Sequence, residues 1–236
     1  MQAGFDRLSL NGLMARADQF FLVFHLDLST ASPLLPTMHR TIFTTPVVNT
    51  ALRGLSLAFL RAKGWQVEGS LPANAEKCVL IAAPHTSNWD LPYTLMVAFV
   101  LRLNVYWIGK ASIFKPPFGP VMRWLGGIAV NREQSTNMVA ASAQALQAAD
   151  GRVQLVVAPE GTRNKSGQAP DWKTGFYYIA QGAGVPILMA YLDYMQKRGG
   201  LGPTLTPSGD VQKDMEIVKA FYAPIRGRHS KQVDAQ

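Results

Sequence analysis

The chain lacks several features that mark whole classes of protein. Its one cysteine, Cys78, cannot form a disulfide within the chain, which excludes a small disulfide-stabilised secreted domain. We read Cys78 as a core residue, because it lies in a short apolar run. The four histidines are too scattered to suggest a zinc site, so no metal is expected. No Gly-x-Ser-x-Gly sequence is present, so a serine nucleophile elbow is excluded.

Long apolar runs are also absent. Residues 174–192 are uncharged, but Gly182, Gly184 and Pro186 divide them into a helix, a turn and a strand rather than a membrane span. The apolar run near the N-terminus is short, and its surroundings are interrupted by acidic residues, so no secretory signal is expected (Asp6, Asp18 and Asp27). We therefore expect a protein that lies on a membrane at most.

Acidic residues are few compared with basic ones. The chain has 23 Lys and Arg against 15 Asp and Glu, a net charge of +8 and a pI of about 9.7. Such a charge favours an anionic partner: nucleic acid, an acidic lipid surface or a phosphate-bearing substrate. The chain shows no basic helix, aromatic-studded sheet or zinc-ligand spacing typical of nucleic-acid binding. With 48% apolar residues, a membrane surface or a phosphate-bearing substrate is the better expectation, and no nucleic acid is expected.

Apolar segments with strand and helix periodicity alternate along the 236 residues, which predicts one domain of the α/β class. Strands are expected at residues 65–69, 78–83, 105–108, 127–130, 153–158 and 185–192. Helices are expected at residues 42–62, 90–103, 121–125, 137–149 and 171–182.

The N-terminal part is harder to assign. Residues 1–37 are interpreted as an extension of uncertain status, and residues 38–236 as the domain, since Met38 could serve as an alternative start. The helix at 42–62 carries a broad apolar stripe with basic edges. That pattern fits a membrane interface and an ordinary core helix equally well.

A histidine follows the most apolar of the expected strands. Residues 78–83 end at Pro84, His85 lies in the turn, and Asp90 is expected as the N-cap of the next helix. An aspartate bonded to one imidazole nitrogen makes the other nitrogen a better base. The same spacing recurs at His229 and Asp234, but in a basic tail with no strand before it. The strand before His85 therefore favours His85 and Asp90 as the catalytic pair.

Polar residues follow three further strands. They are Lys110, Arg132 and the segment Glu160–Arg163. If the strands are parallel, all of these residues meet at one edge of the sheet, where α/β proteins bind ligands. Three cations near one base form an anion site, and arginine can bind phosphate with two hydrogen bonds. Gly161 could allow a tight turn that offers backbone N–H groups.

Four blocks of sequence resemble the glycerolipid acyltransferase family, which contains 1-acyl-glycerol-3-phosphate acyltransferases and related lysophospholipid acyltransferases. In chain order they are His85-x4-Asp90, Gly126–Arg132, Pro159–Arg163 and Val185-Pro186-Ile187. The four blocks in this order are specific, and the resemblance runs from about residue 40 to residue 222. It implies a mixed, mostly parallel sheet flanked by helices, with an N-terminal apolar helical segment.

The resemblance also implies roles for single residues. His85 would be the general base that deprotonates the acceptor hydroxyl, and Asp90 would orient it. Residues that would bind the acceptor head group are Lys110, Arg132, Glu160, Gly161, Thr162 and Arg163. The donor would be acyl-CoA or acyl carrier protein as a co-substrate, with no further cofactor. The acceptor would be a lysophospholipid, and the protein would lie peripherally on the anionic, cytoplasmic face of the cell membrane.

Two other functions stay open. A hydrolase could use the same His-Asp site on thioesters or lipids, with water in place of the acceptor hydroxyl. A non-enzymatic, basic module that binds membranes or nucleic acid would also account for the charge. Mutation of His85 distinguishes these alternatives, because only the enzymes need a base.

Overall fold

The computed structural model describes residues 40–130, 135–161 and 172–229. Within these ranges, seven strands form one sheet in the order β1-β7-β6-β2-β5-β3-β4. The strands are β1 (Gln66–Glu68), β2 (Lys77–Ala83), β3 (Val105–Lys110), β4 (Gly127–Val130), β5 (Val153–Val157), β6 (Ile187–Asp193) and β7 (Arg198–Leu205). Every neighbouring pair is parallel except β6 and β7, which are antiparallel. The predicted α/β fold with a mixed, mostly parallel sheet is confirmed.

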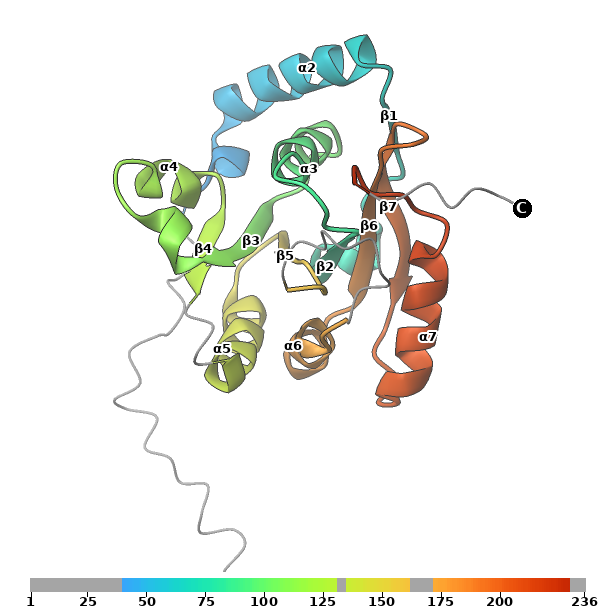
Figure 1. Ribbon diagram of the computed structural model, residues 1–236. Coiled ribbons are helices and arrows are strands. Elements are labelled where there is room, and N and C mark those ends of the chain that lie inside the picture. Colours follow the sequence, from blue (N-terminus) through green and yellow to red (C-terminus); the bar gives the residue numbers. More distant parts are fainter. Residues whose placement is uncertain (1–39, 131–134, 162–171, 230–236) are drawn as a thin grey trace, which may run out of the picture. The chain divides into compact units, whose positions relative to one another are not determined.

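Helices cover both faces of the sheet (Figure 1). On one face lie α2 (Pro46–Ala62), α3 (Asp90–Val100) and α4 (Gly119–Trp124), with the 3-10 turns η1 (Ile42–Thr44) and η3 (Ala111–Phe114). On the other face lie α5 (Ser135–Ala148), α6 (Gly175–Ala183) and α7 (Val211–Tyr222). A further 3-10 turn, η2 (Ala73–Ala75), precedes β2. Each face of the sheet thus has its own apolar core.

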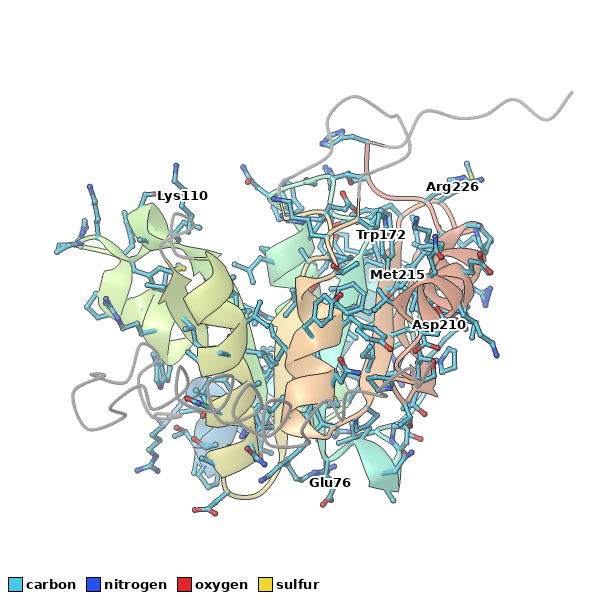
Figure 2. The ribbon with its side chains drawn as sticks, turned by 90° about the horizontal axis from the view of Figure 1, so that it is seen from below. Glu76, Lys110, Trp172, Asp210, Met215 and Arg226 are labelled. Carbon is cyan, nitrogen blue, oxygen red and sulfur yellow. The ribbon has the colours of Figure 1, made fainter. Side chains whose placement is uncertain are left out.

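The parallel pairing decides where the polar residues go. β2 lies between β5 and β6, and β3 lies between β5 and β4, so the carboxyl ends of these strands share one edge of the sheet. Figure 2 shows Glu76, which precedes β2, at the opposite edge of the sheet from Lys110, which ends β3. The polar residues that follow β2, β3 and β5 therefore gather at one edge, as the sequence predicted.

Two elements, β7 and α7, had no clear signal in the sequence. β7 contains Gly199, Gly200, Gly202 and Pro203, residues that are depleted in strands. Glycine is needed there because neighbours come very close: a Cβ on Gly200 would lie 2.1 Å from the carbonyl oxygen of Glu68. A Cβ on Gly202 would lie 2.3 Å from the ring of Phe221, in α7. Contacts between distant segments thus explain a strand that the local pattern does not show.

Several predicted helix boundaries need correction. The expected helix at 42–62 is divided into η1 and α2, because Pro46 starts a new helix at its first position. The expected helix at 90–103 ends at Val100, and Arg102 takes a left-handed φ of 54°. The expected helix at 171–182 begins only at Gly175, and before it the backbone N–H of Lys173 bonds to the Pro159 carbonyl. Cys78 is buried, as predicted. The expected boundary at residue 37 lies outside the described residues.

Candidate active site

His85 and Asp90 are in direct contact. His85 follows the end of β2, and Asp90 is the first residue of α3. The Nδ1 atom of His85 donates a hydrogen bond to Oδ2 of Asp90 at 3.0 Å. Because an ionised carboxylate only accepts, this bond assigns the proton of the neutral ring to Nδ1 and leaves Nε2 as the basic nitrogen. The side chain of His85 keeps 31% of its surface exposed, so a substrate can reach it.

Asp90 is buried and bound by donors on both oxygens. Oδ2 also accepts the backbone N–H groups of Thr86 and Ser87, each at 2.8 Å, and Oδ1 accepts the hydroxyl of Tyr194 at 2.9 Å. Burial acts to raise the pKa of Asp90, but the hydrogen bonds, that from His85 foremost, outweigh burial and hold the pKa below its usual range. The site therefore contains a carboxylate that stays ionised although only 6% of the surface of Asp90 is exposed.

The predicted N-cap role of Asp90 is wrong. Trp89 holds the N-cap position of α3, and Asp90 lies inside the first turn. Its carboxylate turns back toward the N–H groups of the preceding turn, at Thr86 and Ser87, and not toward the N–H groups of its own helix. This arrangement folds the segment from His85 to Asp90 around a single carboxylate.

Glu160 lies beneath the turn that carries His85. Since β2 and β5 are parallel neighbours with Ile81 opposite Val157, the segments that follow them also lie side by side. Oε1 of Glu160 accepts the backbone N–H of His85 at 2.8 Å. Burial raises the pKa of Glu160, aided by the negative charge of Asp90 and opposed by the contacts with His85. The predicted binding residue is therefore seen holding the backbone of the predicted base.

Gly161 forms the tight turn that the sequence predicted, with φ of 65°. Its N–H, however, donates to the Ala158 carbonyl at 3.0 Å and is already used within the turn. Lys173, which the sequence reasoning did not single out, lies against Gly161: a Cβ there would be 3.4 Å from Nζ of Lys173. No local pattern marks this lysine. Its backbone N–H bonds to the Pro159 carbonyl at 2.8 Å, which holds it beside the site.

A cavity of about 730 Å³ adjoins the pair. Its polar end contains His85, Ser87, Lys110 and Gly161. The rest lies between α3 and the sheet and is mainly apolar, lined among others by Leu80, Leu91, Leu95, Ala98, Val105, Trp107, Val156 and Leu201. Lining residues come from both ends of β3, Val105 and Lys110, which at about 3.3 Å per residue are roughly 17 Å apart. The cavity thus suits a long apolar group with a polar head beside His85.

The remaining predicted site residues, Arg132, Thr162 and Arg163, lie outside the described residues. Among the residues that the structure describes, no group of three or more His, Cys, Asp and Glu side chains is placed to hold a metal ion. The described part of the site thus consists of a base, a carboxylate partner, two lysines and an apolar cavity.

The sequence pattern of the protein family described as Acyltransferase matches residues 64–192. This chain belongs to that family. The match includes β1 to β6, both members of the His85–Asp90 pair and the turn at Gly161, so the acyltransferase resemblance noted in the sequence is confirmed.

Single relatives agree with this assignment. The chain is 27% identical over 129 residues to the 1-acyl-sn-glycerol-3-phosphate acyltransferase of Haemophilus influenzae, covering 53% of this chain and 52% of that protein. It is 30% identical over 131 residues to the protein of the same name from Salmonella typhimurium, covering 53% of this chain and 51% of that protein. The chain thus spans about half the length of these relatives.

A solved structure shares the fold of this chain. The crystal structure of the 1-acyl-sn-glycerophosphate (LPA) acyltransferase from Thermotoga maritima superposes with a TM-score of 0.53, at 18% identity. The match covers 77% of this chain and 81% of that one. At this identity the likeness establishes the architecture alone.

Proposed function

We propose that this protein transfers a fatty acyl group from a thioester, an acyl-CoA or an acyl carrier protein, to the free hydroxyl of a lysophospholipid. The expected acceptor is 1-acyl-sn-glycerol-3-phosphate, the substrate in the names of the relatives. One observation carries the proposal: His85, bonded to Asp90, lines the polar end of a long apolar cavity. A base beside such a cavity suits a reaction on a lipid hydroxyl.

His85 and Asp90 would act as a general base and its orienting partner. Nε2 of His85 takes the proton from the acceptor hydroxyl as the oxygen attacks the thioester carbon. The new C–O bond forms, the C–S bond then breaks, and the imidazolium returns its proton to the leaving thiolate. Asp90 stabilises the positive ring between the two proton transfers. The products are an ester and a free thiol, and no acyl-enzyme is formed.

The cavity beneath α3 is our candidate for the acyl chain. Its walls are side chains from α3, β2, β3, β5 and β7, and most of these are apolar. Placing hydrocarbon there removes it from water, which stabilises the bound chain by about 0.8 kcal/mol for each buried CH₂ group. The thioester carbon would then lie at the polar end, next to His85.

Lys110 and Lys173 are candidates for the phosphate of the acceptor, together with Arg132, Thr162 and Arg163. Lys110 lines the polar end of the cavity, and Lys173 lies against Gly161, another residue of the cavity lining. For Glu160, the bond to the backbone N–H of His85 favours a positioning role over head-group binding. Gly161 would supply the left-handed backbone conformation, with φ of 65°, that this turn requires.

The proposed location is the cytoplasmic face of the membrane, as a peripheral protein. Among the described helices, none is both long and apolar enough to cross a bilayer. Large apolar side chains are nevertheless exposed on α2 (Val47, Leu55 and Phe59) and around η3 and α4 (Ile113, Phe118, Val121 and Trp124). Lys110, Lys115 and Arg123 lie among the second group, so both features suit an anionic lipid surface.

The test is acyl transfer from labelled acyl-CoA to a panel of lysolipids, run on the wild type and on His85→Ala. The panel includes lysophosphatidic acid and a matched lysolipid without phosphate. We expect product from the phosphate-bearing acceptor, and a loss of about 10²- to 10⁴-fold in His85→Ala, the usual contribution of a general base. Circular dichroism checks that the variant remains folded.

Other outcomes point elsewhere. Thioester consumption without a lipid product would indicate a hydrolase. Product from the phosphate-free acceptor alone would keep His85 as the base and remove the phosphate role of the lysines and arginines. Full activity in His85→Ala would exclude the mechanism, and binding to anionic vesicles without turnover would indicate a non-enzymatic module.

A further inference from the structure

Tyr194 takes no direct part in the proposed acyl transfer. It is the first residue after β6, and β6 pairs with β2 so that Ala83 lies opposite Tyr191. The carboxyl ends of these two strands therefore bring Tyr194 next to the turn of His85. Its hydroxyl donates to Oδ1 of Asp90 at 2.9 Å, while Oδ2 holds His85. Burial and the charge of Asp90 raise the pKa of Tyr194 well above its usual value, so the hydroxyl remains a donor.

The ring of Tyr194 is held in an aromatic cluster. It meets the ring of Trp65 edge to face, with centroids 5.1 Å apart, and it lies 5.7 Å from the ring of Tyr93. Trp65 and Tyr93 are themselves in contact, with centroids 4.6 Å apart. Such contacts fix the plane of the ring and hence the direction of its hydroxyl.

Arg228 joins Tyr194 to the catalytic turn. Its guanidinium lies 5.8 Å from the ring centroid of Tyr194 and 5.6 Å from that of Trp89, the residue immediately before Asp90. Both distances are within the range of a cation–π interaction. One cation thus contacts both the ring whose hydroxyl bonds to Asp90 and the ring of the residue that precedes Asp90.

The segment that carries Arg228, residues 223–229, follows α7 and passes over the catalytic turn. The backbone N–H of Tyr194 donates to the Arg226 carbonyl at 2.9 Å. Gly227 is so close to the turn that a Cβ would lie 2.6 Å from Cγ2 of Thr86. At the end of α7, the hydroxyl of Tyr222 lies 2.8 Å from the Ile81 carbonyl, in β2. The segment is therefore fixed at both ends.

We propose that Tyr194 is a positioning residue for the His85–Asp90 pair, and that Arg228 holds Tyr194 in place. The inference rests on the proposed acyl transfer, since it gives Tyr194 a part in that reaction. Without the hydroxyl, Oδ1 of Asp90 loses its one side-chain donor among the described residues. The carboxylate is then less firmly oriented, and so is the ring of His85.

The first test is Tyr194→Phe in the full chain, with Tyr93→Phe as the matched control. Both changes remove one hydroxyl from the same aromatic cluster, but of these two hydroxyls only that of Tyr194 bonds to Asp90. Losing a hydrogen bond to a charged group corresponds to a fall in kcat of about ten- to a hundredfold. We expect that fall in Tyr194→Phe with little change in KM, and wild-type kcat in Tyr93→Phe. Equal losses in both variants would overturn the proposal.

The second test uses Arg228→Gln, which alters an exposed side chain and spares the core. An exposed cation–π contact corresponds to a fall in kcat of about two- to fivefold. Arg226→Gln is the control. The Arg226 side chain bonds to the Ala223 carbonyl, and the backbone carbonyl of Arg226, which accepts the N–H of Tyr194, is kept in this variant. A wild-type kcat in Arg228→Gln would show that Arg228 does not hold Tyr194 in place.

A readout without turnover separates this inference from the proposed function. In proton NMR, the Nδ1 proton that His85 shares with Asp90 is assigned as the low-field signal that is lost in His85→Ala. We expect faster exchange of this proton with water in Tyr194→Phe and no change in Tyr93→Phe. If the wild type transfers no acyl group but the signal responds in this way, the proposed function fails and the positioning role stands. An unchanged signal together with an unchanged kcat overturns the positioning role.

Discussion

Asp90 and Asp214 lie in the first turns of helices on opposite faces of the sheet and are bound by the same kinds of donor. Asp90 is in the first turn of α3, and Asp214 is in the first turn of α7. Each accepts a tyrosine hydroxyl at 2.9 Å, from Tyr194 and Tyr177 respectively. Asp90 also accepts two backbone N–H groups and Asp214 accepts one. Burial acts to raise both pKa values, and in both cases the hydrogen bonds outweigh it and lower the pKa.

The difference between them lies in the last partner and in the surroundings. Asp90 also holds the ring of His85 and lines the cavity. Asp214 holds the hydroxyl of Ser208, at 2.9 Å, and is no part of the cavity lining. The donors therefore explain only why a carboxylate can be buried and ionised. Chemistry becomes possible where that carboxylate meets an accessible imidazole beside a space for substrate.

The largest predicted difference between the two aspartates is in turnover. In Asp90→Asn, the amide cannot hold the ring of His85 in the same tautomer, so we expect kcat to fall by about 10²- to 10⁴-fold. Asp214→Asn removes an equally bound carboxylate far from His85 and should leave kcat unchanged. Release of free CoA thiol with time gives both values, and equal losses in the two variants would show that the comparison is false.

Stability provides the control for that comparison. Both substitutions leave buried donors without a full acceptor, which costs about 1–3 kcal/mol of unfolding free energy. Urea denaturation followed by circular dichroism measures it. Similar stability losses with very different kcat values would assign the catalytic effect to His85 and the cavity.

A smaller effect is expected from filling the cavity. Ala98, on α3, lines the cavity, whereas Ala180, on α6, is buried in the core of the opposite face. Ala98→Leu should lower kcat/KM for long acyl donors relative to short ones by about tenfold, the usual effect of a few methylene groups in an apolar pocket. Ala180→Leu should leave this ratio unchanged.

In stability, Ala180→Leu should have the larger effect and Ala98→Leu the smaller one. Because Ala180 is fully buried in the packed core, the extra atoms of leucine should cost about 1–3 kcal/mol of unfolding free energy. The extra atoms at Ala98 enter empty space and should cost less. A series of acyl-CoA chain lengths and a urea titration test both statements, and a changed ratio in Ala180→Leu would contradict the proposed acyl site.

The smallest expected effect is in the pH dependence of stability. Since the pKa values of Asp90 and Asp214 are lowered by folding, their contribution is full above the ordinary value of about 3.9 and is lost as the pH falls through the lowered values. Glu160 has a raised pKa, so its contribution is full at low pH and is lost as the pH rises. We expect Asp214→Asn to lose stability less steeply than the wild type below about pH 4. Urea midpoints over this range measure how steeply stability falls with pH in each protein. Identical slopes in the wild type and Asp214→Asn would exclude a lowered pKa at Asp214.

Much of the site could be predicted because its parts are local. His85 and Asp90 are five positions apart across one turn, so the chain between them can bring them together without help from other segments. Lys110 is the last residue of β3, and the parallel order of the strands brought it to the same edge. The Asp90 N-cap was wrong because backbone donors of the preceding turn, at Thr86 and Ser87, compete for the same carboxylate.

Tyr194 and Lys173 could not be predicted. Tyr194 reaches Asp90 across 104 positions of sequence, and only the pairing of β6 with β2 brings the two together. Lys173 reaches the site through a backbone bond to Pro159. Neither residue carries a periodicity or a motif of its own, since hydrogen bonds between distant segments leave no local pattern in the sequence.

The sequence by itself determined the α/β class, the buried strand that ends at His85, the pairing of His85 with Asp90 and the family. Apolar periodicity and short spacing contain that information, because each depends on neighbouring residues. Only the tertiary structure decided that β7 runs antiparallel through a glycine-rich segment, that Glu160 holds the backbone of His85, and that an apolar cavity lies beneath α3. These features depend on the packing of segments far apart in the chain, which becomes fixed only when the sheet and its helices assemble.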